Sequence, residues 1–279
     1  MRTTVVRRAR LLRAALSAAP VLTFGGVRAA SLAAQAPRHY AVAGILGPGG
    51  EAGKCGSAAQ TPGPGVSILG CTLSGLRFTG TSSTLAGVVG ANVSVQGTST
   101  GPFAPGTTAF SNAGALWTDQ IVFGGTRPAS AAFTVSFNGL LGPGGTVAYG
   151  FEGEATSYDQ TVSRPGAVAD VQTIRVATVD QLPLVFDYFV RAVASVTNSG
   201  SADAPLAGSA FADFAGGVTL TGLAFYDAAG QDITGRVQYT FANGTVIYPQ
   251  QAVPEPAAVA LLAAGLAGAG AIARRRPRA

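Results

Sequence analysis

The sequence is poor in charge and holds a single histidine, and both shortages restrict the chemistry that it can perform. Charged residues make up 11% of the chain, against about 25% in an average soluble domain. A Ser-His-Asp mechanism needs a histidine beside the nucleophile. His39 is the only histidine, and we expect it at the surface because it lies near the N-terminus of the mature chain, where disorder is common. We find no catalytic constellation, so we expect no enzyme activity and no metal or cofactor.

Acidic residues are also few, which gives a formal net charge of +5, and that value at first favours a nucleic-acid partner. The distribution of the charges excludes it. Ten of the 18 basic residues lie in the first 28 positions or in the last six, whereas residues 37–256 carry eight basic and 13 acidic residues. An acidic body would be repelled by phosphate backbones. We therefore expect no nucleic-acid partner.

Only two cysteines are present, Cys55 and Cys71. They could form a disulfide, remain two free thiols or supply half of a metal site. A metal site has no support, because there is no Cys-x-x-Cys motif and only one histidine. We predict a disulfide, since such bonds persist in exported proteins.

An uncharged run of 17 residues, 257–273, lies close to the C-terminus. As a helix it would reach about 25 Å, at the short end of what spans a bilayer. A helix in a soluble core is the alternative. The arginines that follow, Arg274, Arg275 and Arg276, favour a transmembrane helix, because such residues stay on the cytoplasmic side. The upstream chain would then lie outside the cytoplasm.

Pro254, Glu255 and Pro256 precede this run, and the two prolines allow a helix to begin only from about Pro256. The order of Pro-Glu-Pro, short apolar helix and terminal arginines resembles the PEP-CTERM protein-sorting signal. That signal occurs on exported proteins of Gram-negative bacteria that make extracellular polysaccharide. The resemblance covers residues 253–279 and implies that an inner-membrane exosortase recognises Pro254–Pro256 and processes the tail. The same tail is also catalogued as the C-terminal segment of ice-binding proteins, which transfers no activity to the body.

The N-terminus has the order of regions expected of a secretory signal peptide, which we assign to residues 1–36. Residues 2–13 carry five arginines, residues 14–27 are uncharged, and small residues follow. Cleavage before Ala30 or before Ala34 would suit these small residues. An amphipathic helix is the structural alternative.

The body, residues 37–252, reads as strands and turns. Apolar residues alternate with polar or small ones in 133–137, 147–151, 186–196 and 237–241, and a period of two predicts half-buried strands. In 218–226 the alternation slips at Gly222, which suggests a β-bulge. Glycine-rich turns separate these runs, among them Leu-Gly-Pro-Gly-Gly at Leu46 and at Leu141. The pattern predicts an all-β domain, a β-sandwich of a jelly-roll-like kind.

Three pairs of polar residues are candidates for chemistry. Glu152 and Glu154 share a strand face, and we interpret them as a solvated edge at a strand end. Asp227 and Asp232 flank Gly230, where a hairpin turn fits better than a calcium loop. Thr219 and Thr221 lie on one strand face, as in ice-binding arrays, but one pair makes no array.

The sequence thus predicts an exported structural or binding protein, anchored in the inner membrane during sorting and then placed at the cell surface or in the extracellular matrix. Its expected partners are the sorting protease, the inner membrane and extracellular polysaccharide. Two alternatives remain. One is a secreted hydrolase that acts on this polysaccharide, which would need two carboxylates converging in the folded body. The other is a β-domain that binds ice or carbohydrate through a threonine-rich or aromatic face.

Overall fold

A computed structural model of the chain describes residues 36–55, 61–85, 87–154, 156–179, 182–200 and 204–247. The chain divides into two compact units, Met1–Tyr248 and Pro249–Ala279. Residues 1–35 of the predicted signal peptide, the expected transmembrane helix 257–273, the Pro254–Pro256 motif and the Arg274–Arg276 cluster lie outside the described residues. Within the residues that are described, no helix has the length and apolar character needed to cross a membrane.

The body is built from two antiparallel sheets. Sheet A has eight strands in the order β10-β9-β12-β7-β1-β2, with β3 also paired to β1 and β14 also paired to β7. Its strands are β1 (Arg38–Gly47), β2 (Gly50–Cys55), β3 (Thr61–Pro62), β7 (Thr108–Phe123), β9 (Gly145–Gly153), β10 (Thr156–Val162), β12 (Leu184–Thr197) and β14 (Tyr239–Phe241). Sheet B has six strands in the order β11-β8-β13-β6-β5-β4. Its strands are β4 (Gly65–Leu73), β5 (Leu76–Leu85), β6 (Val88–Phe103), β8 (Ser130–Leu141), β11 (Gly166–Ala177) and β13 (Ala204–Tyr226).

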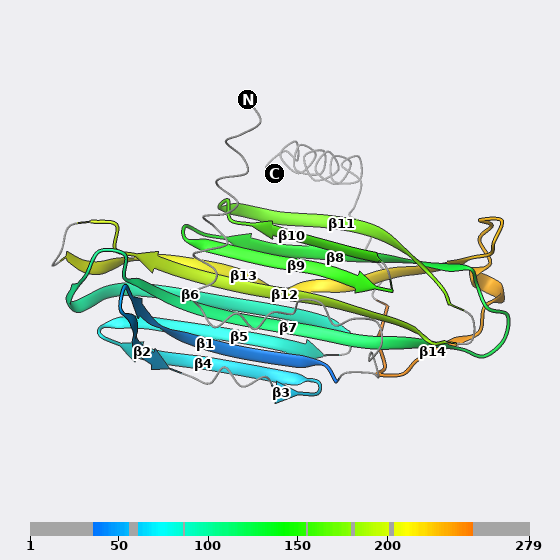
Figure 1. Cartoon of the computed structure of the whole chain (residues 1–279), viewed down its shortest axis with the longest axis horizontal. Coiled ribbons are helices and arrows are strands. Elements are labelled where there is room, and N and C mark those ends of the chain that lie inside the picture. The colour runs from blue at the N-terminus through cyan, green and yellow to red at the C-terminus, as the bar shows by residue number, and fades with distance from the viewer. Residues whose placement is uncertain are drawn as a thin grey trace, which may run out of the picture. The chain divides into compact units, whose positions relative to one another are not determined.

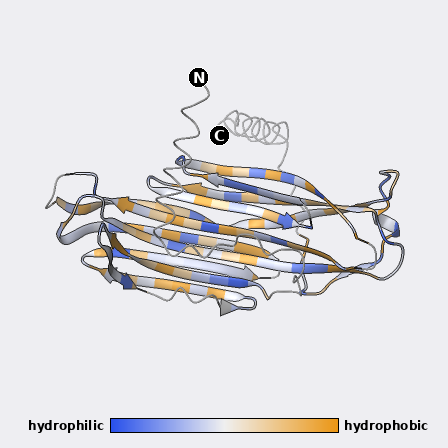
Figure 2. Ribbon diagram, viewed as in Figure 1, coloured by the Kyte–Doolittle hydropathy of each residue, from blue (hydrophilic) through white to orange (hydrophobic). Residues whose placement is uncertain are grey.

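The two sheets pack face to face and enclose one hydrophobic core. Along β12 buried and partly buried residues alternate from Leu184 to Ser195, and Figure 2 shows hydrophobic and hydrophilic residues interspersed along the strands. In Figure 1 β10 and β11 lie at one edge of the sandwich, and β2, β3 and β4 lie at the opposite edge. Apart from the 3-10 turn η1 (Thr234–Arg236), the described residues contain no helix. The predicted all-β sandwich is confirmed.

The core is aromatic in one part and made of small residues in another. Where β8, β9 and β12 meet, the Phe133 ring lies 4.9 Å from that of Phe151 and 4.8 Å from that of Phe186. Between β1, β5 and β7 the buried residues include Ala41, Ala43 and Ala113. Small side chains let the sheets approach closely here, and serine hydroxyls bond backbone oxygens of the facing sheet.

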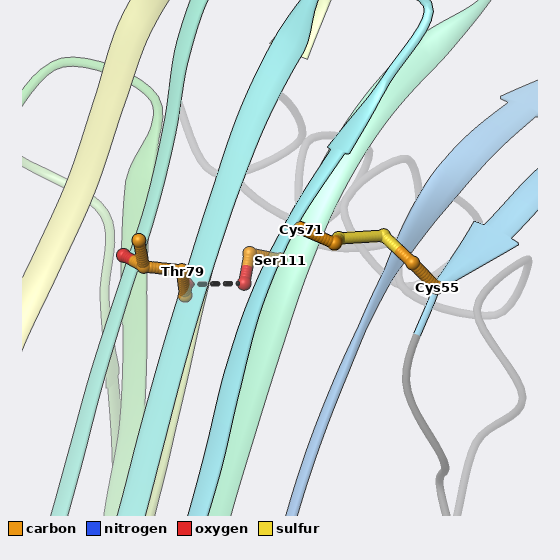
Figure 3. Close-up of a disulfide and its surroundings, with 4 residues drawn as sticks. All are labelled: Cys55, Cys71, Thr79 and Ser111. Carbon is orange, nitrogen blue, oxygen red and sulfur yellow. Dashed lines mark hydrogen bonds between the residues drawn. A yellow bond between two sulfur atoms is a disulfide. The ribbon is translucent and has the colours of Figure 1, made fainter.

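Two such bonds join the sheets. The Ser111 hydroxyl on β7 donates to the Thr79 carbonyl on β5 at 2.7 Å (Figure 3), and the Ser82 hydroxyl on β5 donates to the Tyr40 carbonyl on β1 at 2.7 Å. A Cβ added to Gly80 would lie 3.4 Å from the Ala41 methyl group and from Ser111 Oγ. Both sheets therefore depend on small residues along this line of contact.

The predicted bulge lies in β13. The register with β8 shifts between Leu220 and Gly222. Val218 and Leu220 are buried, and beyond the shift Phe225 is again buried while Leu223 packs against the core. The extra residue therefore returns both later side chains to the inner face, although simple alternation would turn them outward.

The strands predicted over 133–137, 147–151 and 186–196 are confirmed as parts of β8, β9 and β12. The fourth is confirmed only over Tyr239–Phe241, because η1 and two coil residues occupy the positions before it. Both Leu-Gly-Pro-Gly-Gly segments contain turns, with Gly50 at φ 117° where β2 begins and Gly144 at φ 66° between β8 and β9. A side chain at Gly144 would also collide with the Ser195 carbonyl, 2.3 Å from the added Cβ.

Candidate functional site

The disulfide closes one edge of the sandwich. Cys55 ends β2 in sheet A, Cys71 lies in β4 of sheet B, and their Cα atoms are 6.5 Å apart (Figure 3). The predicted pairing is present in the structure. Because β2 and β4 are the outermost strands of the two sheets on this side, the covalent bond joins two edges that backbone hydrogen bonds do not.

The opposite edge is closed by hydrogen bonds to Asp170 on β11. Its carboxylate accepts the hydroxyl protons of Tyr158 at 2.5 Å and Tyr149 at 3.3 Å, and an amide proton of Gln172 at 2.7 Å. Burial and the Asp170 charge raise the pKa of Tyr149 to about 12 and also raise the pKa of Tyr158. Both phenols therefore stay protonated donors that join β9 and β10 of sheet A to sheet B.

His39 is buried, and the prediction of a surface residue is wrong. It lies in β1, is 3% exposed, and its Nδ1 is 2.6 Å from the Ser67 hydroxyl on β4. Burial lowers the pKa of His39, which favours the neutral ring. The physical reason is that the ring points inward against β4 of the facing sheet, where a Cβ added to Gly65 would lie 3.0 Å from His39 Nε2.

A buried carboxylate holds the last described residues of the body against sheet A. Asp119 on β7 is fully buried and accepts the backbone N–H groups of Asn243 at 2.7 Å and of Thr245 at 3.0 Å. It also accepts the Thr245 hydroxyl at 2.5 Å, and that hydroxyl in turn accepts the Trp117 indole N–H at 2.8 Å. We call Asp119, Trp117, Asn243 and Thr245 the Asp119 latch.

This latch was not predicted from the sequence. A signal was available. Trp117 and Ile121 are buried at alternate positions of β7, so Asp119 occupies an inward position between them. An inward carboxylate in an apolar strand needs several donors.

Two carboxylates meet on the outer face of sheet A. Glu152 on β9 is directly opposite Asp187 on β12. Burial and the neighbouring Glu152 charge raise the pKa of Asp187 to about 7, and burial together with Asp159 raises the pKa of Glu152. Among the described residues, Asp187 Oδ1 is buried and has no hydrogen-bond partner. Asp187 can therefore hold a proton near neutral pH.

The interpretation of Glu152 and Glu154 as a solvated edge is wrong for Glu152. The strand does end at Gly153, as expected. However, β9 lies between β10 and β12 and is not an edge strand. The alternation predicts the strand face on which Glu152 lies, but only the strand order brings Asp187 beside it.

Asp227 and Asp232 stabilise a turn, as the hairpin interpretation predicts. Asp227 Oδ1 accepts the N–H groups of Ala229 and Gln231, and Asp232 pairs with Tyr226 in an isolated antiparallel bridge. Hydrogen bonds from Thr234 lower the pKa of Asp232. In the described ranges between residues 36 and 247, no three His, Cys, Asp or Glu side chains are grouped to hold a metal ion.

The outer face of sheet B is rich in hydroxyl and amide groups. The Thr79 and Ser94 hydroxyls on β5 and β6 are 2.8 Å apart, and those of Thr134 and Thr173 on β8 and β11 are 3.3 Å apart. The strand registers place the following side chains on this hydroxyl-rich face: Thr79, Thr81, Ser83, Asn92, Ser94, Thr134, Ser136, Asn138, Thr173 and Thr219. The array spans five strands.

Of the threonine pair singled out in the sequence, Thr219 lies on this face by its register with Ser136. Thr221 lies at the bulge and donates its hydroxyl proton to the Thr134 carbonyl at 3.1 Å. The array was not visible in the sequence, because its members come from strands far apart in the chain.

The comparisons with known proteins bear on the tail. No curated protein and no solved structure matches the chain. A protein-family model described as the PEP-CTERM protein-sorting motif matches residues 252–276. This match includes Pro254, Glu255 and Pro256, the uncharged run and Arg274–Arg276. The chain is therefore an exported protein that carries a PEP-CTERM sorting motif, the signal by which an exosortase sorts its substrates.

Proposed function

We propose that this protein is a structural or binding component of the cell surface or extracellular matrix, and that its body is no catalyst. The observation that carries the proposal is the PEP-CTERM match at residues 252–276. Residues 257–273 would anchor the precursor in the inner membrane, with Arg274–Arg276 on its cytoplasmic side. The exosortase would recognise Pro254, Glu255 and Pro256. The body is delivered outside as a jelly-roll-like sandwich, which fits a chain that passes repeatedly between the two sheets.

The partner that we propose for the body is neutral extracellular polysaccharide. Support comes from the hydroxyl-rich face of sheet B, where exposed Thr81 and Thr173 lie among further hydroxyl and amide groups. Such groups can both donate and accept hydrogen bonds, as sugar hydroxyls do. The cross-linked edges at Cys55–Cys71 and Asp170 keep this face in one shape.

The experiment that tests the proposal changes Pro254, Glu255 and Pro256 to Ala in the full chain. No apolar residue of the run 257–273 is altered, so membrane insertion should continue while processing stops. We expect the unprocessed precursor to accumulate in the inner membrane, measured by membrane fractionation and intact mass. Pro277→Ala, in the same tail, is the control and should mature normally. Normal maturation of the triple variant would mean that Pro-Glu-Pro is only a linker.

A secreted hydrolase acting on the polysaccharide remains a second candidate, because Glu152 and Asp187 face each other on neighbouring strands. A glycosidase needs one carboxyl group that keeps its proton near neutral pH and one that is ionised. Asp187, with its pKa raised to about 7, fits the first role. The test is release of reducing ends from the polysaccharide of the producing cells. Activity that disappears in both Asp187→Asn and Glu152→Gln would replace the structural proposal.

A further inference from the structure

The edge strands of the two sheets differ in how they are protected against pairing with another chain. Exposed edges in natural proteins are blunted by charge, by proline or by shortness. Strand β2 carries Lys54, β10 carries Asp159, β11 carries Arg175, and β3 contains Pro62. Strand β14 has three residues. Strand β4 has none of these protections, since its nine residues include no charge and no proline.

Strand β4 also presents apolar side chains to solvent. Ile68 is 80% exposed and Val66 is 46% exposed, and both lie on the outer face of sheet B, opposite Thr81 and Ser83 of β5. Gly70 follows on the same face, and a Cβ there would meet nothing within 4 Å. Within the described part of the chain, no strand pairs with the other side of β4.

The edge is held rigid. Cys71 lies within β4 and is bonded to Cys55 on β2, and the inward Ser67 hydroxyl contacts His39 at 2.6 Å. A strand fixed at both positions keeps its backbone N–H and C=O groups in place. Such preorganisation lowers the entropy cost of adding a further strand.

We propose that β4 is a self-association edge, at which β4 of one molecule pairs antiparallel with β4 of a second copy. This pairing joins two six-stranded sheets into one continuous sheet about a twofold axis. A pairing centred on Ile68 sets Ile68 opposite Ile68 of the second copy and Val66 opposite Gly70 of that copy, and it keeps the outward side chains on one face. The two hydroxyl-rich faces then form one surface.

A second copy is the occupant that the chemistry favours. A twofold pair sets the strand against its own sequence, so a charge near the axis would lie beside the same charge of the second copy. Strand β4 is the one long edge strand among the described residues with no charge to repel. Its apolar outward residues, Val66 and Ile68, complement their own copies.

The test measures the molar mass of the processed wild-type protein in solution, by sedimentation velocity over a range of concentrations. Ile68→Lys and Ile68→Glu place like charges opposite each other, and we expect each to weaken association by at least about tenfold. An equimolar mixture of the two variants sets Lys against Glu and should recover the dimer. Val171→Lys is the matched control, because Val171 is 49% exposed on the outer face of sheet B but lies on the opposite edge strand, β11. It should associate like wild type.

Two readouts separate association from folding. Each variant should keep the wild-type far-UV spectrum, and the recovery in the mixture requires both proteins to be folded. A wild-type protein that stays monomeric at a concentration of about 100 μM would overturn the proposal. So would a dimer that persists in Ile68→Lys, or a mixture that stays monomeric while each variant is folded.

Discussion

The Asp119 carboxylate accepts two hydrogen bonds from Thr245, one from the backbone N–H at 3.0 Å and one from the side-chain hydroxyl at 2.5 Å. The two residues are 126 positions apart. Their contact fixes the last part of the body to β7, a strand inside sheet A. Six residues, 248–253, then separate Ile247 from Pro254. The sorting motif therefore begins shortly after a residue that belongs to the folded core.

The first prediction concerns this latch. Asp119→Ala should destabilise the protein by about 3 kcal/mol, because it leaves the N–H groups of Asn243 and Thr245 buried without an acceptor. Urea unfolding of the processed protein measures the loss. Asp213→Ala is the control, since Asp213 is exposed and its carboxylate accepts the Ala215 N–H at 3.2 Å. Equal effects of the two substitutions would mean that the latch contributes little.

The second prediction concerns the disulfide. Alkylation of the exported protein without reductant should label neither Cys55 nor Cys71. The double variant Cys55→Ser/Cys71→Ser should lose about 3 kcal/mol of unfolding free energy, because the bond closes a short loop and restricts the unfolded chain. Reductant should lower the urea midpoint of the wild-type protein and leave that of the double variant unchanged. Labelling of both cysteines in the non-reduced protein contradicts the pairing.

The third prediction concerns pH and Asp187. Its pKa is about 7 in the folded protein, against an ordinary value of 3.8. The folded state thus binds this proton more tightly than the unfolded chain, and the stability that it contributes is lost as pH rises from about 4 to about 7. Asp187→Asn should therefore be more stable than wild type at pH 8, by on the order of 2 kcal/mol, and similar to it at pH 4.

Thermal unfolding at both pH values measures this difference. Glu154→Gln is the control. Glu154 lies just beyond the end of β9, so this substitution removes one carboxylate from the same region. It should leave the pH dependence unchanged. If Asp187→Asn shows the wild-type pH dependence, the carboxyl group is ionised in the folded protein throughout this range.

The fourth prediction concerns the basic end of the tail. Replacement of Arg274, Arg275 and Arg276 with Ser should weaken membrane retention or let the tail pass through the membrane. The reason is that a run of 17 weakly apolar residues anchors a protein only marginally. Membrane fractionation separates this defect in topology from the defect in maturation expected of the Pro-Glu-Pro variant. Unchanged retention would show that the apolar run anchors the precursor without these arginines.

Local pattern was sufficient for the strands, because each strand carries its own alternation. Phe133, Val135 and Phe137 specify an inner face by themselves, and the slip at Gly222 marks the bulge of β13. Turns were equally visible, since Gly50 and Gly144 occupy positive φ angles that glycine adopts readily. The sandwich follows from these local signals.

The sites were less predictable, because they depend on which strands become neighbours. Glu152 and Asp187 are 35 positions apart in the sequence, and nothing in their local segments indicates that β9 and β12 pair. The burial of His39 was not predicted for a related reason, since it depends on β4 of the facing sheet. The sorting motif is the exception, as its parts are contiguous in the chain.

The strand order has a consequence for when the protein can fold. Strand β12 lies between β9 and β7, and β13 lies between β8 and β6. Both come late in the chain, so an emerging polypeptide that has reached only residue 180 lacks the strand that joins the two halves of each sheet. Long-range pairing of this kind slows folding and leaves intermediates exposed. Because the Asp119 latch closes only with Thr245, nearly the whole body must be free to fold before folding can finish. Until then the open chain is exposed to chaperones and proteases.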